Sequence, residues 1–339
     1  MAKIAINGFG RIGRLFFRSA FGRPDMEVVA VNDLGDVENL AYLLKYDTVY
    51  RAYGKSVEVK DGNLVVDGKV IRFLQIKDPA TIPWGEMGID VVIESTGAFE
   101  SFEKAATHLV GGAKRVVISA PAKDADGPMG KTILMGVNDG EMGSVKVTSN
   151  GSCTTNACSP VIAVLDEGLG IEKAFLNTTH AYTATQSIVD SPVKGKDFRR
   201  GRAAAQNISP SSTGAAISVT RAIPSMAGKF DGIAVRTPSI TGSLADITFV
   251  AKRDTTPEEV NEILKKGASS PRWSGLLAAT DEQLVSSDII GASVASIVDL
   301  QFTKVIGGDL VKVLAWYDNE AGYVSTLIAH VLKSAESVK

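Results

Sequence analysis

The stretch KIAINGFGRIGRLFFRSAF, residues 3–21, joins a short apolar run to a helical pattern across a glycine-rich turn. The first part predicts a buried strand, and apolar residues at helical spacing follow it. Gly8, Gly10 and Gly13 form G-x-G-x-x-G, and a second apolar run ends at Asp33, twenty residues after Gly13. Strand, glycines, helix, strand and acidic residue at this spacing are typical of a dinucleotide-binding unit. A glycine turn that binds no nucleotide is the alternative.

Each of these residues has a physical reason to be there. Gly8 permits a tight turn, Gly10 leaves room for a pyrophosphate, and Gly13 lets the helix pack closely on the sheet. The helix N-terminus offers N–H groups and partial positive charge to the phosphates. The Asp33 carboxylate can accept hydrogen bonds from the ribose hydroxyls and would repel the 2′-phosphate of NADP. The pattern therefore favours NAD as the cofactor.

The rest of the chain predicts an α/β protein of two domains. Residues 90–96 and 114–121 read as further buried parallel strands, and 56–74 as antiparallel hairpins around Asp-Gly turns. We expect a Rossmann-type parallel sheet in residues 1–152. Longer amphipathic strands then predict an α+β catalytic domain with a largely antiparallel sheet in residues 153–318. A C-terminal helix, about 319–339, should pack back on the first domain.

Composition excludes several classes of protein. The chain has 339 residues, a formal net charge of −2 and two cysteines. This charge gives no electrostatic reason to bind nucleic acid or anionic lipid, and no apolar run approaches the ~18 residues of a membrane-spanning helix. The N-terminus does not resemble a signal peptide, and two cysteines do not form a disulfide framework. We expect a soluble cytoplasmic protein.

Both cysteines lie in NGSCTTNACSP, residues 150–160. Their C-x4-C spacing lacks the second ligand pair of a zinc site, so no metal is expected. A free cysteine is commonly a small buried hydrophobe, but Cys153 stands at or just before a predicted helix, whose dipole would stabilise a thiolate. Pro160 leaves the first helical residue undecided.

A nucleophilic cysteine needs a base, and the chain has three histidines. His108 lies in a predicted crossover helix, which we expect to be far from the strand ends, and His330 in the terminal helix suits packing. His180 stands at the end of a predicted strand that leads into a long polar loop at 191–206. His180 is therefore the candidate base.

Nine motifs occur in order along nearly the whole chain: GFGRIGR, VND, ESTG, ISAPAKD, SCTTN, HAYTATQ, RRGRAAA, PSSTGAA and YDNEAGY. Together they closely resemble the phosphorylating glyceraldehyde-3-phosphate dehydrogenases. The resemblance implies that Cys153 attacks the aldehyde to form a thiohemiacetal, with His180 as base. Hydride transfer to nicotinamide would leave a thioester, which inorganic phosphate would cleave. The Cys153 amide and the His180 ring are plausible oxyanion donors.

The resemblance also implies binding residues. The substrate phosphate site would use Thr183, Thr185, Arg236 and, in preference to Arg199, Arg200. The attacking-phosphate site would use Ser152, Thr154, Thr213 and Gly214. The cofactor site would use Asn7, Gly8, Gly10, Arg11, Ile12, Gly13, Asp33, Lys77, Thr96, Gly97, Ser119 and Asn319. It implies a homotetramer, in which the loop at 191–206 reaches a neighbouring subunit's cofactor.

Some features depart from the family pattern. Ala157 stands where a second cysteine is usual, with Cys158 one residue later, and Lys77 replaces a usual arginine. None of these changes removes a group that the mechanism requires. Two other functions stay open: an erythrose-4-phosphate dehydrogenase on the same scaffold, and an NAD-binding protein without catalysis.

Overall fold

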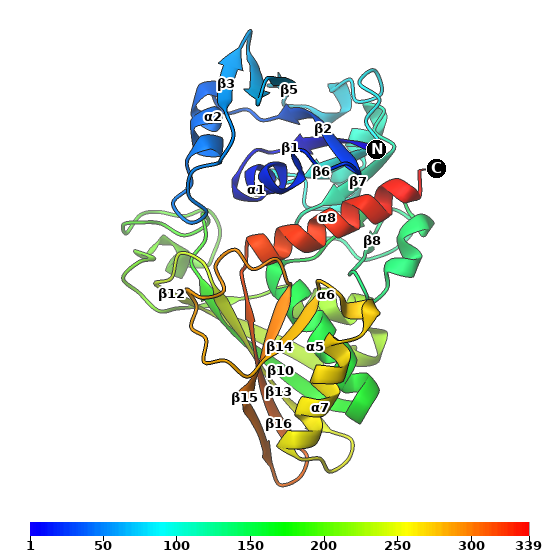
Figure 1. Cartoon of the computed structure of the whole chain (residues 1–339), viewed down its shortest axis with the longest axis vertical. Helices are drawn as coiled ribbons and strands as arrows, with labels where there is room; N and C mark the ends of the chain where they lie inside the picture. Colours follow the sequence, from blue (N-terminus) through cyan, green and yellow to red (C-terminus); the bar gives the residue numbers. More distant parts are fainter. Residues whose placement is uncertain (339) are drawn as a thin grey trace. The chain divides into compact units, whose positions relative to one another are not determined.

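The computed structural model describes residues 1–338, which form two compact units (Figure 1). Unit 1 comprises residues 1–151 and the chain from Thr326 onward, and unit 2 comprises residues 152–325. The expected domains were 1–152 and 153–318 with a terminal helix from about 319; in the structure the last division falls inside helix α8 (Ala321–Glu336). Among the described residues, no helix has the length and apolar character needed to cross a membrane.

Unit 1 is built on a sheet of nine strands, most of which pair in parallel. In spatial order the strands are β3 (Val57–Lys60), β4 (Asn63–Val66), β5 (Lys69–Leu74), β2 (Met26–Asn32), β1 (Ala2–Asn7), β6 (Val91–Glu94), β7 (Arg115–Ile118), β9 (Val147–Ser149) and β8 (Lys131–Thr132). The prediction of a Rossmann-type parallel sheet is confirmed.

The strands β3, β4 and β5 form two antiparallel hairpins. Each two-residue turn has positive φ at both positions: 50° at Asp61 and 74° at Gly62, then 46° at Asp67 and 76° at Gly68. Two successive positive φ angles match the right-handed twist of the flanking strands, and Asp-Gly tolerates them best. The Asp-Gly pairs in the sequence therefore place both turns.

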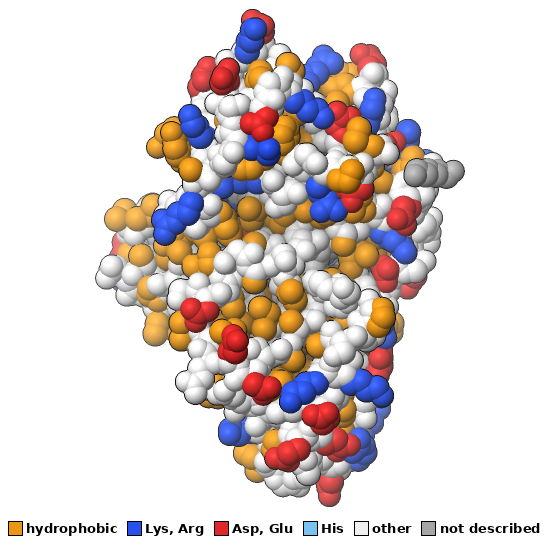
Figure 2. Space-filling view, viewed as in Figure 1, with side chains coloured by type: hydrophobic (Ala, Val, Ile, Leu, Met, Phe, Trp, Pro, Cys, Tyr) orange, Lys and Arg blue, Asp and Glu red, His pale blue; other side chains and the backbone are white. Residues whose placement is uncertain are grey.

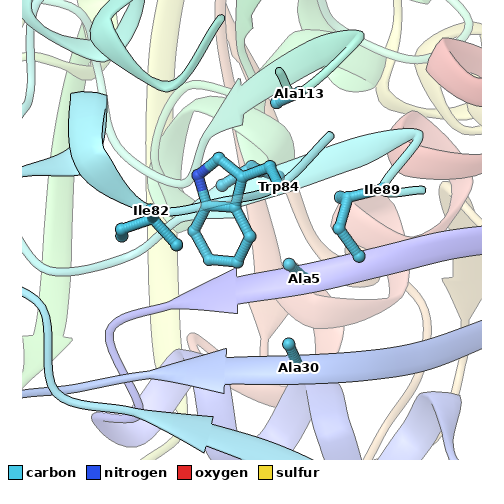
Figure 3. Close-up of a cluster of buried hydrophobic side chains, with 7 residues drawn as sticks. Ala5, Ala30, Ile82, Trp84, Ile89 and Ala113 are labelled. Atoms are coloured by element: carbon cyan, nitrogen blue, oxygen red, sulfur yellow. The ribbon is translucent and has the colours of Figure 1, made fainter. Parts of the chain in front are cut away.

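The helices of unit 1 cover this sheet and enclose its core. They are α1 (Arg11–Ala20), α2 (Val37–Lys45), α3 (Phe102–Ala105), α4 (Thr107–Val110), the end of α8, and the 3-10 turns η1 (Pro79–Thr81) and η2 (Asp139–Ser144). The predicted single crossover helix is thus two short ones. One core cluster surrounds the fully buried Trp84, whose ring packs among Ile82, Ile89 and Ala5 (Figure 3). The end of α8 is tied to β7 by a hydrogen bond from Arg115 to Ser334.

Unit 2 is built on a seven-stranded sheet in which β10 pairs in parallel with β12, β14 pairs in parallel with β15, and the other neighbours pair antiparallel. In spatial order the strands are β11 (Ser209–Ser212), β12 (Phe230–Thr237), β10 (Ile171–Ala181), β13 (Ser243–Ala251), β16 (Leu310–Tyr317), β15 (Ser296–Ile306) and β14 (Leu277–Thr280). The prediction of a largely antiparallel α+β fold is confirmed.

Three helices and three 3-10 turns accompany the sheet of unit 2 in the described residues. They are α5 (Cys153–Leu169), α6 (Ala215–Ala222) and α7 (Pro257–Ala268), with 3-10 turns η3 (Phe198–Gly201), η4 (Pro224–Met226) and η5 (Pro271–Trp273). The Thr256 side chain caps α7 by accepting from the Glu259 amide, and Pro257 is its first residue. On the visible surface, acidic and basic side chains are interspersed within each unit (Figure 2).

Candidate active site

The predicted cofactor residues of unit 1 follow the carboxyl ends of its parallel strands. Asp33 comes directly after β2, Thr96 follows β6 and Ser119 follows β7, while Lys77 follows β5. The carboxyl ends of parallel strands meet at one edge of a sheet, which is where open α/β folds bind ligands. The fold thus brings this set to one edge of unit 1.

The three glycines of the first turn differ in what surrounds them. A Cβ on Gly8, whose φ is 97°, would lie 2.6 Å from the Thr96 amide nitrogen, and one on Gly13 would lie 2.2 Å from the Gly8 oxygen. A Cβ on Gly10 would meet no protein atom within 4 Å. Packing therefore explains Gly8 and Gly13, whereas the chain itself gives no steric reason for Gly10. The open space at Gly10 fits a dinucleotide pyrophosphate beside the start of α1.

Asp33 closes this turn. One carboxylate oxygen accepts from the Phe9 amide at 2.6 Å and the other from the Gly35 amide at 2.8 Å. Each carboxylate oxygen has a second lone pair. Asp33 can therefore hold the glycine turn and still accept hydrogen bonds from two ribose hydroxyls.

Two other predicted cofactor residues have their side chains engaged within the protein. The Asn7 side chain is buried: its Nδ2 donates to Glu94 Oε2 at 2.6 Å, and its Oδ1 accepts from Asn32 at 2.7 Å. The Thr96 hydroxyl hydrogen-bonds the same glutamate. The expectation that His108 is far from the strand ends was wrong, because its Nε2 lies 3.0 Å from Glu94, the last residue of β6. The short α3–α4 crossover carries this ring inward.

In unit 2, Cys153 is the first residue of α5. Ser152 is the N-cap: its hydroxyl accepts from the Thr155 amide at 3.1 Å, and the Thr155 hydroxyl accepts from the Ser152 amide at 3.1 Å. Pro160 lies inside the helix, so it does not start it. This reciprocal cap leaves the amides of Cys153 and Thr154 to interact with the Cys153 sulfur, where they stabilise the thiolate.

His180 faces this sulfur from β10. The Cys153 Sγ lies 3.4 Å from His180 Nε2. On the other side of the ring, Nδ1 lies 2.7 Å from the Ala181 carbonyl oxygen, which can only accept. We therefore assign the ring proton to Nδ1, and this leaves Nε2 free to accept a proton from the thiol.

Arg236 lies beside His180 because the two residues are register partners on the parallel strands β10 and β12. Its Nη1 donates to the Ala181 oxygen at 3.0 Å and approaches His180 Nδ1 to 2.5 Å. With the proton on Nδ1, this second approach joins two donors and is not a hydrogen bond. It instead places a positive charge against the imidazole.

Burial dominates the electrostatics of this pair. Loss of solvent raises the pKa of the Cys153 thiol, while the charge of Arg236, the Thr154 hydroxyl and the nearby amides act against the rise. Burial, and next the Arg236 charge, lower the pKa of His180 to about 3. Both effects favour the neutral thiol and the neutral imidazole. The dipole effect predicted from the sequence is present, but burial outweighs it.

The Tyr317 hydroxyl connects the two elements that carry the pair. It lies 2.9 Å from the Thr154 hydroxyl on α5 and 2.7 Å from the Thr178 hydroxyl on β10. Its ring packs edge-on against His180 at 5.9 Å, and burial raises its pKa. A buried hydroxyl with two partners fixes the spacing between helix and strand.

Two arginines line a cavity close to this pair. Arg200 and Arg236 border it with Gln186, Ser209 and Ser211. Arg200 donates to the Thr185 hydroxyl at 3.1 Å and to the Ser211 hydroxyl at 3.2 Å. The Thr183 and Thr185 hydroxyls lie 3.0 Å apart. Arginines and hydroxyl donors in such an arrangement can bind a phosphate.

The neighbouring arginine is arranged differently. Arg199 also borders this cavity, but its Nε pairs with Asp197 at 2.8 Å. Arg200 is thus the one bonded to a predicted phosphate residue. The predicted residues Thr213 and Gly214 precede α6, where the Thr213 hydroxyl accepts from the Ala215 amide. Helix α6 packs against α5, the helix that carries Thr154.

Asn319 completes the predicted cofactor set. Its Oδ1 accepts from the Thr241 hydroxyl at 3.3 Å, the Gly242 amide at 3.1 Å and the Ser243 hydroxyl at 3.1 Å. Three donors on one oxygen fix the orientation of the amide, so its NH₂ group points the other way. The orientation suits a donor to a carbonyl group of a ligand.

Sequence reasoning missed Tyr317, Glu94, Ser209 and Ser211. Tyr317 is the first residue of the quoted motif YDNEAGY and Glu94 the first of ESTG, but only the strand pairing shows what their side chains contact. Ser209 is the register partner of Arg236 on β11. Within residues 1–338, no three His, Cys, Asp or Glu side chains are grouped so that they could hold a metal ion.

The two units match two family models. Residues 2–102 match the glyceraldehyde 3-phosphate dehydrogenase NAD binding domain, and residues 152–319 match the C-terminal domain of the same family. The chain is 48% identical to the glyceraldehyde-3-phosphate dehydrogenase of Streptomyces coelicolor over 96% of each chain. It is 46% identical to that of Clostridium pasteurianum over 97% of each chain, and 48% identical to that of Geobacillus stearothermophilus over 95% of this chain and 94% of the relative. Because matches of this length and identity extend over both units, the chain belongs to the glyceraldehyde 3-phosphate dehydrogenase family.

Proposed function

We propose that this protein is an NAD-dependent phosphorylating glyceraldehyde-3-phosphate dehydrogenase, which converts D-glyceraldehyde 3-phosphate and inorganic phosphate to 1,3-bisphosphoglycerate. The observation that carries the proposal is the 3.4 Å approach of Cys153 Sγ to His180 Nε2, with Arg236 beside the ring. Family membership supports the same reading, and the names of the relatives above favour it over an erythrose-4-phosphate dehydrogenase.

The chain's own residues account for each change of bonding. His180 Nε2 takes the thiol proton while the Cys153 sulfur forms a bond to the aldehyde carbon, and it returns this proton to the aldehyde oxygen, giving a thiohemiacetal. The Cys153 amide and the His180 ring stabilise the oxygen of this adduct. NAD, when bound, would supply the acceptor for the hydride, and His180 Nε2 takes the hydroxyl proton as this hydride leaves the former aldehyde carbon. The resulting thioester is attacked by a phosphate oxygen, the acyl phosphate leaves, and the Cys153 thiolate is released.

The neutral state of Cys153 and His180 fits this order of steps. A thiol and an imidazole that are both neutral before the substrate binds need a transfer of one proton along the Sγ to Nε2 contact. Arg236 lowers the pKa of His180 and stabilises the thiolate. The anionic substrate would reduce the net positive charge around Arg236, which favours the protonated imidazole at the moment of attack.

The proposed reaction requires two phosphate-binding sites, one for the substrate phosphate and one for the attacking phosphate. We propose that Arg200, Arg236, Thr183 and Thr185 hold the substrate phosphate, because Arg200 and Thr185 are already bonded to each other and the arginines share a cavity. We propose Ser152, Thr154, Thr213 and Gly214 for the attacking phosphate. Thr213 is half-buried and Gly214 is exposed at the start of α6, where the amides of a helix N-terminus can bind an anion.

NAD would be held by the glycine turn, by Asp33 and by the groups that follow the parallel strands of unit 1. Its pyrophosphate suits the open space at Gly10, and its adenosine ribose suits Asp33. The charge on Asp33 selects NAD over NADP.

The decisive experiment follows NADH absorbance with glyceraldehyde 3-phosphate, with and without phosphate, for the wild type and Cys153→Ser. We expect phosphate-dependent NADH formation by the wild type and none by the variant, while both bind NAD. Turnover that is indifferent to phosphate would exclude the phosphorylating reaction, and a preference for erythrose 4-phosphate would identify the alternative substrate. An intact NAD affinity without any turnover would indicate a binding protein.

We also propose that the protein acts as a homotetramer in the cytoplasm. Several large apolar side chains of unit 2 are exposed in the single chain. Phe175 on β10 is 50% exposed, Phe302 on β15 is 53% exposed, and Ile188 in the loop after β10 is 85% exposed. A second copy would cover such surface. The reduced thiol that the reaction needs persists in a reducing compartment. Light scattering coupled to size exclusion tests the tetramer.

A further inference from the structure

A buried polar network lies beneath the glycine turn of unit 1, and the proposed reaction assigns no role to three of its members. Trp84 and His108 are fully buried, and Glu94 and Asn7 are each 2% exposed. A carboxylate and an imidazole in such a place need hydrogen-bond partners to be stable. Their partners therefore show how the network is organised.

Trp84 determines the tautomer of His108. The indole Nε1 lies 3.0 Å from His108 Nδ1. An indole N–H can only donate, so Nδ1 accepts and the ring proton is on Nε2. The carbon atoms of the Trp84 ring pack in the apolar cluster (Figure 3). The core of unit 1 thus fixes which nitrogen of His108 is the donor.

His108 in turn holds Glu94. Its Nε2 lies 3.0 Å from Glu94 Oε2, and the assigned proton donates to that oxygen. Asn7 Nδ2 donates to the same oxygen at 2.6 Å. The other oxygen, Oε1, accepts from the Thr96 amide at 2.8 Å and from the Thr96 hydroxyl. All four groups around the carboxylate are donors, so each is held in one orientation.

The two residues fixed by Glu94 flank the nucleotide turn. Asn7 directly precedes Gly8, and Thr96 lies 2.6 Å from where a Gly8 Cβ would be. Between them, the Ser95 hydroxyl donates to the Gly8 carbonyl oxygen at 2.7 Å. The turn after β1 and the turn after β6 are therefore joined into one unit, with Glu94 beneath both.

We propose that Trp84, His108 and Glu94 are positioning residues for dinucleotide binding. They hold the Gly8 turn and Thr96 in the binding geometry before the ligand arrives, so that no binding free energy is spent on ordering these turns. This inference rests on the proposed use of NAD. It adds that NAD affinity depends on a hydrogen-bond chain that begins in the hydrophobic core and contacts no ligand.

The first test compares Trp84→Phe with Trp273→Phe. Both tryptophans are buried, and Trp273 lies in unit 2. We expect Trp84→Phe to raise the Kd for NAD about tenfold, through the unpaired His108 nitrogen, and to change kcat at saturating NAD by less than about twofold. Trp273→Phe should leave the Kd unchanged. Titration calorimetry with NAD and melting temperatures for each variant measure binding and folding separately.

The second test uses His108. Glutamine has one acceptor and one donor group, so His108→Gln can accept from Trp84 and donate to Glu94, whereas His108→Leu can do neither. We expect NAD affinity close to wild type in the first variant and about tenfold or greater loss in the second. Nitrogen-15 NMR of the three histidines should show His108 protonated on Nε2 alone in the wild type, and a changed signal in Trp84→Phe.

The outcomes separate this inference from the proposed function. A wild-type chain that does not bind NAD would remove the proposed function and this inference with it. Wild-type binding together with an unchanged Kd in Trp84→Phe and His108→Leu would overturn the positioning role alone. Equal losses in Trp84→Phe and Trp273→Phe, or in His108→Gln and His108→Leu, would reduce the network to general stability and overturn it as well. If Trp84→Phe does not fold, the two His108 variants decide.

Discussion

Two helices of this protein start directly after a strand, and their first turns are built in different ways. Helix α1 begins after Gly10, which makes no side-chain cap, and the space beside Gly10 is open. Helix α5 begins after Ser152, which forms a reciprocal cap with Thr155, and its first residue is Cys153. Both helix ends present positive potential. The open turn leaves space for a bound anion, whereas in the capped turn the sulfur of Cys153, which belongs to the chain itself, lies against the first amides of the helix.

Replacing His180, the partner of the Cys153 thiol at the start of α5, should have the largest effect on activity. We expect His180→Gln to lower kcat by about 10²–10⁴-fold, because the thiol loses the base at Nε2. The Kd for NAD should not change, because the α1 turn is intact. Stopped-flow NADH formation and NAD titration measure the two sides, with His330→Gln as the control for loss of a buried histidine. A kcat near that of the wild type would mean that another group takes the proton.

Adding a methyl group at the α1 turn tests its openness. Gly13→Ala places a Cβ 2.2 Å from the Gly8 oxygen, and we expect it to destabilise the protein by about 1–3 kcal/mol. Gly10→Ala has no protein atom within 4 Å of the new carbon. It should keep the wild-type melting temperature and weaken NAD binding about tenfold, on the order of the 1.4 kcal/mol that this factor represents. If Gly10→Ala binds NAD with the wild-type Kd, the pyrophosphate does not bind in the open space beside Gly10.

Acid should affect both units through one buried histidine in each. Burial lowers the pKa of His180 and of His330 to about 3. In the unfolded chain each would gain a proton near pH 6.5, so the folded state is favoured above that pH and loses stability as the pH falls from about 6.5 toward 3. We expect a loss of about 2 kcal/mol per histidine between pH 7 and pH 5.

Urea unfolding at pH 7 and pH 5 measures this acid sensitivity. In His330→Gln, the free energy of unfolding should fall by about 2 kcal/mol less between pH 7 and pH 5 than in the wild type, because one of the two histidines is gone. The variant should also be less stable at pH 7, because His330 hydrogen-bonds Thr148 and Asn150. An unchanged difference between the two pH values would show that His330 takes up a proton in the folded state as readily as in the unfolded chain.

Deleting the α5 cap gives the smallest expected effect. Ser152→Ala removes the acceptor of the Thr155 amide and should cost about 1 kcal/mol of unfolding free energy. It should also slow alkylation of Cys153 by iodoacetamide, because the first turn that holds the sulfur becomes less ordered. Thr256→Ala removes the matching cap of α7 and should cost about the same stability without any change in alkylation. Equal alkylation rates in the two variants would show that the Ser152 cap does not affect the reactivity of the Cys153 thiol.

The sequence was sufficient wherever a property depends on neighbouring residues. The glycine spacing placed the turn after β1, and the Asp-Gly pairs placed both hairpin turns. The cysteine and the histidine could be named because few residues have the required chemistry. Pro160 shows the limit: it lies inside α5, where packing against the rest of unit 2 tolerates it.

The side-chain partners of the histidines could not be predicted from the sequence. His330 was expected to pack, and it is buried among Thr148 and Asn150. His108 was expected far from the strand ends, but two short helices bring it to Glu94. Side-chain partners so distant in sequence depend on strand register and on helix direction, and neither follows from local patterns.

The sequence by itself determined the glycine-rich turn, the cysteine that we propose as nucleophile and the family, because these depend on residue type and short spacing. Only the tertiary structure decided that His180 faces Cys153 at 3.4 Å, that Arg236 lies beside it, and that burial shifts the pKa of both partners. The physical reason is that distance and solvent exclusion arise from strands paired across dozens of residues. A linear pattern supplies the chemical groups, and the fold sets the charge each one carries.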